Sequence, residues 1–340
     1  MTRPCPAWAP GARAGVGASR VAVSGGPWAA LADFLEARLP PGQPWRERLA
    51  RGDVLDAEGR AFSADARCPP GNTVLWYWRS LPPEPRVPFE IELLHQDEHL
   101  VAVDKPHFLP VTPGGRYLQE TVLVRLKRLL NIETLVPMHR LDLETAGVLL
   151  FMVQPATRHA YQAMFRERRV QKVYEAVAPW REDLDLPVTV RSRLQERPGE
   201  AFMQMEAVPG ETNAITQVEL IATLSALVSV APLAPLAPLA PLAPLAPLAP
   251  LAHYRLRPMT GAKHQLRAHM NALGLAICGD RIYPRLWPAP PTGAPPDYTQ
   301  PLQLLARELR FTDPVTGQAR CFISRRGLQA LQGLKGLEGR

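Results

Sequence analysis

The sequence is poor in cysteine and lacks long apolar runs. Four cysteines, Cys5, Cys68, Cys278 and Cys321, are scattered over 340 residues without a CxxC pair. This usage argues against a disulfide framework and a zinc site and fits a reducing cytosol, so we expect a cytoplasmic protein. No apolar run reaches the length that a bilayer requires. The N-terminus carries arginines but no apolar segment of a secretory signal.

Lysine is also scarce, although the chain is basic. There are 39 Lys and Arg residues against 32 Asp and Glu residues, a net charge of +7, and lysine occurs only at positions 105, 127, 172, 263 and 335. A basic protein suits a polyanionic partner such as nucleic acid. Abundant Arg, Ala and Pro can also follow from coding bias, so composition alone leaves the partner open.

Composition divides the chain into five parts. Residues 1–26 are rich in Ala, Gly, Pro and Arg and predict a disordered tail. Residues 27–81 combine helical spacing of apolar residues with short strand-like runs, which predicts a small folded module. Prolines in residues 82–88 predict a stiff linker. A large domain follows at residues 89–328, and residues 329–340 form the predicted C-terminal tail.

The tripeptide Ala-Pro-Leu recurs seven times at residues 231–251. A proline at every third position excludes helix and central strand and favours an extended polyproline arm. Because strand-like segments flank the repeat, we interpret it as an expanded hairpin loop without chemistry of its own. A ligand for a proline-reading domain is the alternative, but the repeat has no anchoring charges.

The most informative stretch is HRLDLETAG at residues 139–147. The apolar run 148–153 follows it and predicts a buried strand. Alternate residues of an extended segment point to the same side, so Arg140 and Asp142 share a face. On spacing alone these two residues are either a surface ion pair at a strand entry or charges presented to a ligand.

A second block, RPMTGAKHQLRAHM at residues 257–270, runs from a strand through a Thr-Gly turn into a helix. The segment ICGDRIYP at residues 277–284 follows shortly after it. His264 and His269 are five residues apart, which places them on different helix faces and argues against a metal site. Arg267, three residues after His264, is expected on the same helix as that histidine.

Both blocks resemble motifs of the RluA-type pseudouridine synthases, HRLDxxTxG and RPxTGRxHQLRxHxxxxGxxIxGDxxYG. The Lys105-Pro106 dipeptide ahead of an apolar turn is similar to the first motif of that family. The resemblance runs in the right order through residues 86–325, and no departure removes a group that the chemistry needs. The departures from the family pattern are Ala146, Ala262, Pro284 and Asp313.

The resemblance implies an α+β chain with the pseudouridine-synthase fold. That fold has a large mixed, mainly antiparallel sheet with flanking helices and a central catalytic cleft. The module at residues 27–81, two helices and then a hairpin, resembles the ribosomal-protein-S-four-like RNA-binding module, with a generic cap as the alternative. The family needs neither metal nor cofactor, and a monomer is the default.

The resemblance also assigns roles to individual residues. Asp142 would be the nucleophile, Arg267 its ionic partner, and Tyr174 the ring that stacks on a uracil flipped out of the RNA. Arg140 would fill the gap left in the RNA stack or bind a phosphate. The other residues expected to bind substrate are His139, Lys172, Thr260, Lys263, His264 and Gln265.

Three functions compete at this point. The first is an RNA uridine isomerase, acting on ribosomal RNA or, as second choice, transfer RNA. The second is a non-catalytic RNA-binding or ribosome-assembly protein on the same fold, which the basic charge favours, but such a protein is expected to lose Asp142 or Arg267. The third is a nucleic-acid hydrolase. The sequence argues against it, because it shows neither a second paired carboxylate nor a metal cluster.

Overall fold

The computed structural model forms two compact units, residues 1–86 with 112–133 and residues 87–111 with 134–340. Residues 112–133 therefore cluster with the N-terminal part, whereas the sequence places them in the large domain. The Ala-Pro-Leu repeat lies outside the described residues except for its last two positions. The structure describes residues 16–39, 43–78, 84–115, 117–199, 203–224, 250–288, 291 and 294–335.

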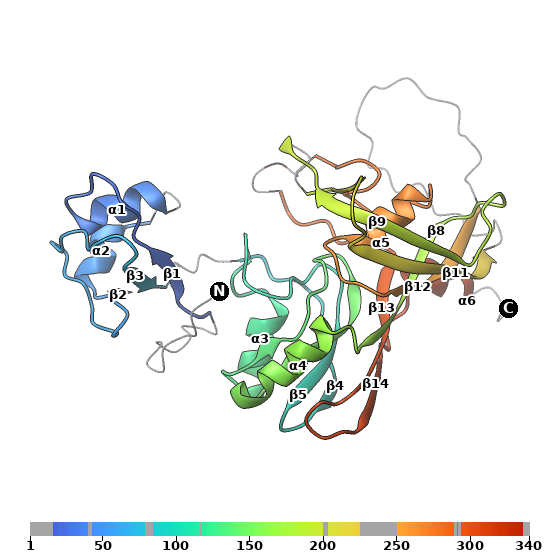
Figure 1. Cartoon of the computed structure of the whole chain (residues 1–340), viewed down its shortest axis with the longest axis horizontal. Coiled ribbons are helices and arrows are strands. Elements are labelled where there is room, and N and C mark those ends of the chain that lie inside the picture. The colour runs from blue at the N-terminus through green and yellow to red at the C-terminus, as the bar shows by residue number, and fades with distance from the viewer. Residues whose placement is uncertain are drawn as a thin grey trace. The chain divides into compact units, whose positions relative to one another are not determined.

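The first unit contains a three-stranded antiparallel sheet in the order β1-β3-β2 (blue in Figure 1). Phe34, Leu49 and Leu75 are buried between its helices and the sheet. The two helices and the β2–β3 pair confirm the predicted helices and hairpin, while the S-four-like resemblance stays a prediction. The elements are β1 (Ser19–Ala22), α1 (Leu31–Arg38), α2 (Trp45–Ala50), β2 (Val54–Leu55), β3 (Val74–Tyr77) and α3 (Val122–Leu130).

Both predicted tails contain regular structure. β1 lies in the tail predicted for residues 1–26 and pairs with β3, so the tail prediction is wrong for this stretch. The helix α6 (Gln329–Lys335) lies in the tail predicted for residues 329–340, and Leu331 packs against a buried cluster. Both elements are short and gain their stability from tertiary contacts, which periodicity in the sequence does not reveal.

The predicted linker at residues 82–88 is held in place over its described part. The Glu84 carboxylate accepts hydrogen bonds from the backbone N–H groups of residues 118–120, at 2.9–3.0 Å. Val87 is fully buried. The segment from residue 84 onward is therefore anchored, and the prolines do not make it a free spacer.

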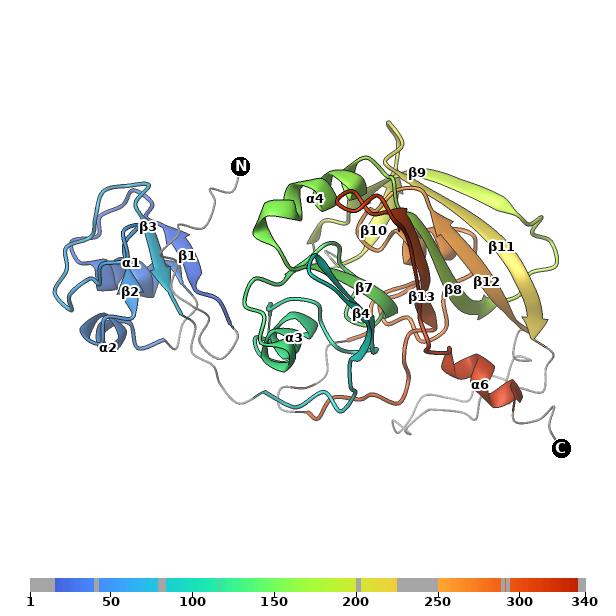
Figure 2. The ribbon, with the colours of Figure 1, turned by 90° about the horizontal axis from the view of Figure 1, so that it is seen from below.

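The second unit is built on an eleven-stranded sheet in the order β10-β9-β11-β12-β8-β13-β7-β5-β4, with β14 beside β13 and β6 beside β7 (Figures 1 and 2). Every pair is antiparallel except β13 with β7. The predicted mixed, mainly antiparallel sheet is confirmed. Its strands are β4 (Glu92–Gln96), β5 (Leu100–Lys105), β6 (Val136–Pro137), β7 (Ala146–Met152), β8 (Gln171–Pro179), β9 (Val188–Glu196), β10 (Met205–Val208), β11 (Ala214–Leu224), β12 (Leu251–Pro258), β13 (Leu304–Thr312) and β14 (Ala319–Ile323).

Two helices cover separate parts of this sheet. A 3₁₀ turn at Pro155–Thr157 leads into α4 (Arg158–Arg166), which packs Tyr161 and Met164 on the buried residues of β5 and β7. The helix α5 (Gln265–Ala272) packs Leu266 and Met270 on β12 and its neighbours. No helix in the described ranges is long and apolar enough to cross a bilayer.

The strand β13 brings together two segments that are far apart in sequence. Its Ala306 lies opposite Gly147 of β7 on one side and opposite Tyr174 of β8 on the other. Gly147 has a φ of +114°, and a Cβ at this position would lie 2.2 Å from the Ala306 carbonyl oxygen. Only glycine permits this approach, which positions the 139–147 loop close to Tyr174.

The Ala-Pro-Leu repeat joins two paired strands. β11 and β12 are antiparallel neighbours, and Leu224 lies opposite Leu251 at the end of the pair. The predicted position of the repeat, between two strands of a hairpin, is therefore confirmed.

Candidate active site

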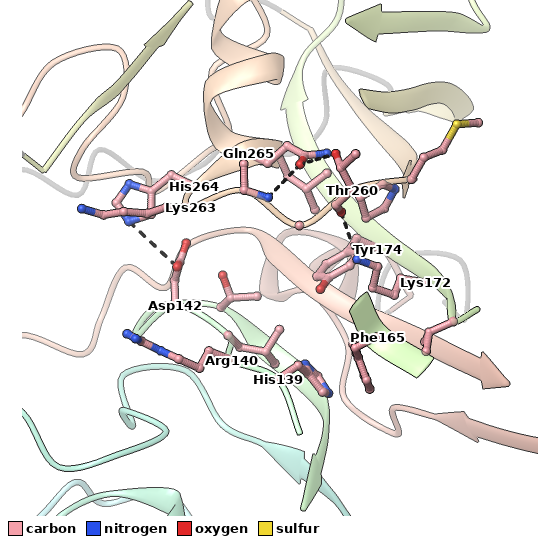
Figure 3. Close-up of a pocket in the computed structure, with 18 of the residues that line it drawn as sticks. His139, Arg140, Asp142, Phe165, Lys172, Tyr174, Thr260, Lys263, His264 and Gln265 are labelled. Atoms are coloured by element: carbon pink, nitrogen blue, oxygen red, sulfur yellow. Dashed lines mark hydrogen bonds and ion pairs between the residues drawn. The ribbon is translucent and has the colours of Figure 1, made fainter. Parts of the chain in front are cut away.

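A cavity of about 1080 Å³ lies between the loop before β7, the strand β8 and the start of α5 (Figure 3). The loop supplies one wall, and the turn from β12 into α5 supplies the opposite wall. Every residue that the sequence assigned to the site lines this cavity. These residues are His139, Arg140, Asp142, Lys172, Tyr174, Thr260, Lys263, His264, Gln265 and Arg267.

Arg267 is the electrostatic centre of the site. It is 2% exposed, and its Nε and Nη2 donate to the two carboxylate oxygens of Asp280, at 2.8 and 2.6 Å. The same Nη2 donates to Glu144 at 3.1 Å, and Nη1 donates to Asp142 at 3.4 Å. Burial opposes the charged form, but the hydrogen bonds that Arg267 donates to Asp280 raise the pKa of Arg267 above its ordinary value.

The three carboxylates around Arg267 differ in their surroundings. Asp280 is buried and also accepts hydrogen bonds from the backbone N–H groups of residues 282 and 283. Burial raises the pKa of Glu144, and the Arg267 charge opposes this rise. Asp142 has the longest bond to Arg267, and its side chain is 32% exposed. Asp280 thus fixes the guanidinium, and Asp142 is the partner that faces the cavity.

Tyr174 and Lys172 project from β8 into the same cavity, as their alternation along a strand predicts. Burial and the Asp142 carboxylate raise the pKa of Tyr174 above its usual range, so the hydroxyl keeps its proton at neutral pH. The Lys172 Nζ donates to the Thr260 carbonyl at 3.0 Å, and burial and Arg168 lower the pKa of Lys172. In Figure 3 these two side chains lie across the cavity from Arg140.

The side chains of Thr260 and Gln265 hold the turn between β12 and α5. The Gln265 Oε1 accepts from the Thr260 hydroxyl at 2.7 Å and from the Ala262 N–H at 3.0 Å. Its Nε2 donates to the Ile215 carbonyl and the Thr216 hydroxyl, both at 2.9 Å. These four bonds occupy both lone pairs of the Gln265 amide oxygen and both of its N–H groups. This arrangement favours a role in holding the turn over the predicted contact with substrate.

His264 lies just before the helix and not on it, because α5 begins at Gln265. Its φ of +49° is in the left-handed region, and its ring meets the Tyr283 ring edge-on at 6.1 Å. Its Nε2 is 3.9 Å from an Asp142 oxygen, and its buried Nδ1 has no partner among the described residues. Burial lowers the pKa of His264, although the Asp142 charge opposes this shift.

His139 is part of the protein framework. Its Nε2 accepts from the Leu150 N–H at 3.2 Å, and its ring stacks on Phe165 at 5.1 Å. Burial lowers its pKa to about 3, so the ring is neutral at physiological pH. These contacts favour a structural role for His139 over the predicted contact with substrate, although the residue lines the cavity.

Arg140 and Lys263 lie at the cavity rim and differ in their partners. Arg140 is exposed and has no hydrogen bond or ion pair to the described residues. Figure 3 shows its side chain extending away from Tyr174. The Lys263 Nζ is 2.7 Å from a Glu196 carboxylate oxygen, and this ion pair is solvent-exposed. Arg140 is thus the freer of the two cations for a phosphate or a base.

Sequence reasoning did not single out Lys105 as a site residue. It is fully buried, and its Nζ donates to the carbonyls of Pro106, Leu109 and Leu143 at 2.8–3.0 Å. Burial lowers its pKa to about 7. Because Leu143 follows Asp142, these bonds hold the loop that presents Asp142. The sequence feature that could have indicated Lys105 is the Lys-Pro dipeptide of the first motif.

Two departures from the family pattern have structural explanations. Ala262 packs against an apolar cluster that includes Ile282 and Tyr283. The buried Asp313 accepts from the Tyr161 hydroxyl, at 3.1 Å to each oxygen, and from two N–H groups of its own turn. In the described ranges, no group of three or more His, Cys, Asp or Glu side chains could hold a metal ion.

Comparison with known proteins identifies the family. The model of the RNA pseudouridylate synthases matches residues 99–272, slightly more than half of the chain. The chain belongs to this family. A Synechocystis protein named as an uncharacterized RNA pseudouridine synthase is 32% identical over 241 residues, which cover 71% of this chain and 74% of that protein. The dual-specificity RNA pseudouridine synthase RluA of Haemophilus influenzae is 29% identical over 233 residues, covering 68% and 91% respectively.

Structural comparison agrees on the fold of this pseudouridylate synthase. The human RNA pseudouridylate synthase domain containing 1 superposes with a TM-score of 0.50 at 19% identity, covering 76% of this chain and 98% of that one. The predicted α+β pseudouridine-synthase fold is confirmed. Family membership also confirms the predicted activity, an isomerase that converts uridine to pseudouridine in RNA.

Proposed function

We propose that Asp142, Arg267 and Tyr174 perform the isomerisation in the cavity described above. The observation that carries the proposal is the geometry around Arg267. Asp142 lies 125 residues away in sequence, yet it bonds to this guanidinium and is the one carboxylate of the three that lines the cavity. A fixed cation beside a partly exposed carboxylate holds that carboxylate in place and aims it at a bound nucleotide.

The reaction moves the glycosidic bond of uridine from N1 to C5 of the base. Asp142 attacks the ribose or the uracil ring, and the covalent bond that it forms is broken again when the base rejoins the sugar. The C5 proton is released and N1 acquires a proton, so the carboxylate is regenerated. Arg267 stays bonded to Asp280 throughout, since that pair is buried and bidentate.

Tyr174 provides the surface on which the flipped uracil rests. A base stacked in RNA cannot reach Asp142, so the target nucleotide has to leave the stack. The raised pKa of Tyr174 keeps its ring neutral, and a neutral aromatic face stacks well on a pyrimidine. Arg140, free at the rim, fills the vacated position in the RNA or binds a neighbouring phosphate.

The contacts of the other cavity residues distinguish those assigned to RNA binding from those assigned to positioning the turn between β12 and α5. Lys172 and Lys263 point cationic groups into the cavity or its rim and are assigned to RNA. His264 is assigned to the wall beside Asp142. Thr260 and Gln265, whose polar atoms are used within the protein, are assigned to positioning the turn.

We propose ribosomal RNA as the first choice of substrate and transfer RNA as the second. The enzyme is proposed to act as a cytoplasmic monomer. The net charge of +7 and the small helix-and-sheet unit support a structured RNA as target. The name of the Haemophilus relative, a dual-specificity enzyme, is consistent with more than one RNA.

Asp142→Asn tests the catalytic proposal. The variant keeps the size of the side chain and one acceptor oxygen but removes the nucleophile. We expect pseudouridine formation to fall by at least about 1000-fold, while RNA affinity stays within a few-fold of the wild type. Chemical mapping of pseudouridine in total RNA, from cells with the wild-type gene, the variant or neither, provides the readout and identifies the uridine. Pseudouridine formed by the variant at the wild-type rate would disprove the assignment.

A further inference from the structure

An exposed tryptophan lies outside the catalytic cavity, shortly after the segment at residues 277–284. Trp287 is 50% exposed. Its backbone N–H donates to the Arg281 carbonyl at 2.9 Å, which closes a turn and holds the two residues close together. A half-exposed indole beside a guanidinium presents a π-face to solvent, on which the ring of a ligand can stack.

Arg281 lies between two aromatic rings. Its guanidinium carbon is 5.9 Å from the centre of the Trp287 ring and 6.0 Å from that of Phe108. Its Nη2 contacts Asp297 at 3.3 Å, and its buried Nε has no partner among the described residues. Phe108 in turn meets the ring of Tyr298 at 5.3 Å. Trp287 and Arg281 thus form the outer layer of a stacked, cationic aromatic group.

This group is joined to the catalytic residues through two direct neighbours in the chain. Asp280, which precedes Arg281, anchors Arg267. His107, which precedes Phe108, contacts the Glu144 carbonyl through Nδ1 at 2.6 Å. The positive charge of Arg281 also opposes the rise that burial causes in the pKa of Glu144. The aromatic group is therefore held rigidly beside the loop that carries Asp142.

We propose that Trp287 and Arg281 form a stacking platform for an unpaired nucleobase that flanks the target uridine. The proposal rests on the proposed function and adds a second contact to the RNA outside the catalytic cavity. Every base has a π-face, so an indole backed by a guanidinium binds unpaired nucleotides with little sequence preference. A duplex offers no free face, so the platform selects single-stranded RNA next to the flipped uridine.

The charge at the platform favours RNA as its occupant. Arg285, two residues before Trp287, is exposed and has no ion pair with a described residue. A guanidinium beside a stacking ring suits the phosphate that accompanies a base. An apolar protein partner would have to bury the charge of Arg285, which is costly without a paired acid.

The test compares Trp287→Ala and Trp287→Phe with a matched control, Ile323→Ala, which removes a 52% exposed apolar side chain on β14. The probe is a fluorescently labelled single-stranded RNA of mixed sequence, alone or annealed to its complement. We expect Trp287→Ala to weaken binding of the single strand about tenfold, and Trp287→Phe to retain most of the affinity. Duplex binding and the slope of affinity against salt should stay unchanged, because no phosphate contact is lost.

The control variant and the wild type should bind both probes equally well, and thermal unfolding should show that all variants are folded. Wild-type affinity of Trp287→Ala for the single strand would overturn the proposal, and so would an equal loss for the duplex. Pseudouridine formation by the wild type on cellular RNA is measured separately. Its absence would reject the proposed function, whereas the binding comparison decides on the platform.

Discussion

At the scale of single residues, the site depends on one guanidinium that serves three carboxylates. Asp280 uses two N–H groups of Arg267, so little of the fork remains for the other two acids. The bond to Asp142 is accordingly the longest. Such an arrangement holds the cation firmly and would let Asp142, the proposed nucleophile, move away from it during the reaction.

Arg267→Lys should separate charge from geometry. A lysine keeps the positive charge but has no planar fork, so it cannot bond to Asp280 at two points and still reach Asp142. We expect the single-turnover rate of pseudouridine formation to fall by about 100-fold or more. The free energy of unfolding should fall by about 1–3 kcal/mol, because buried carboxylates lose donors. A rate within twofold of the wild type would show that charge alone suffices.

The motifs of the sequence were sufficient to predict which residues would meet around the cavity, but not what each one contacts. Asp142, Tyr174 and Arg267 stand out because their types and order match a known chemistry. The roles of Lys105 and Glu144 depend on burial and on partners from distant segments. Such contacts exist only after folding, so a single sequence carries no direct signal for them.

At the scale of elements, the parallel pair of β7 and β13 determines where the 139–147 loop lies. Strands with long apolar or alternating runs, such as β7 and β8, could be predicted from periodicity. Short elements such as β1 and α6 could not, since their hydrogen bonds and packing come from elsewhere in the fold. The residue spacing also did not predict the left-handed backbone of His264, which lies just before the start of α5.

Gly147→Ala tests the strand contact directly. The added methyl group would lie 2.2 Å from the Ala306 carbonyl oxygen, and the φ of +114° is unfavourable for alanine. We expect a loss of at least about 3 kcal/mol in the free energy of unfolding, together with loss of activity as the 139–147 loop moves away from Tyr174. Urea unfolding followed by circular dichroism measures the first effect.

Gly114→Ala is the matched control for that substitution. The added Cβ would lie 4.0 Å from the Thr112 carbonyl oxygen, an ordinary contact, and the φ of Gly114 is not in the left-handed region. This variant should unfold within about 1 kcal/mol of the wild type. Equal stability of the Gly147 and Gly114 variants would contradict the steric argument.

At the scale of the whole molecule, buried neutral histidines should govern stability in mild acid. Burial lowers the pKa of His107 and of His269 to about 4, and that of His139 to about 3. Each ring binds a proton in the unfolded chain at its ordinary pKa of 6.5, but not in the folded chain until the lower value is reached. Each therefore contributes stability that is complete above pH 6.5 and is lost as the pH falls from 6.5 towards 4.

The carboxylates with lowered pKa values do not cause a loss of stability between pH 7 and pH 5. The pKa of Asp97 and that of Glu175 are both lowered to about 2. Burial opposes this lowering, while hydrogen bonds and ion pairs, to His95 and His253 first, produce it. Their contribution is present above the unfolded values of 3.8 and 4.5 and is lost only below them. A decline between pH 7 and pH 5 therefore reports on the histidines.

His269→Gln isolates one of these groups. His269 is 1% exposed and lies 2.9 Å from the hydroxyls of Thr216 and Ser192. Between pH 7 and pH 5 its protonation in the unfolded chain should cost about 2 kcal/mol of stability. The glutamine variant should be less stable at pH 7 but should lose about 2 kcal/mol less than the wild type over that interval, as urea unfolding at several pH values would measure. His159→Gln, which makes the same substitution at an exposed position, is the matched control. Parallel curves for the wild type and His269→Gln would mean that the buried ring is already charged in the folded protein.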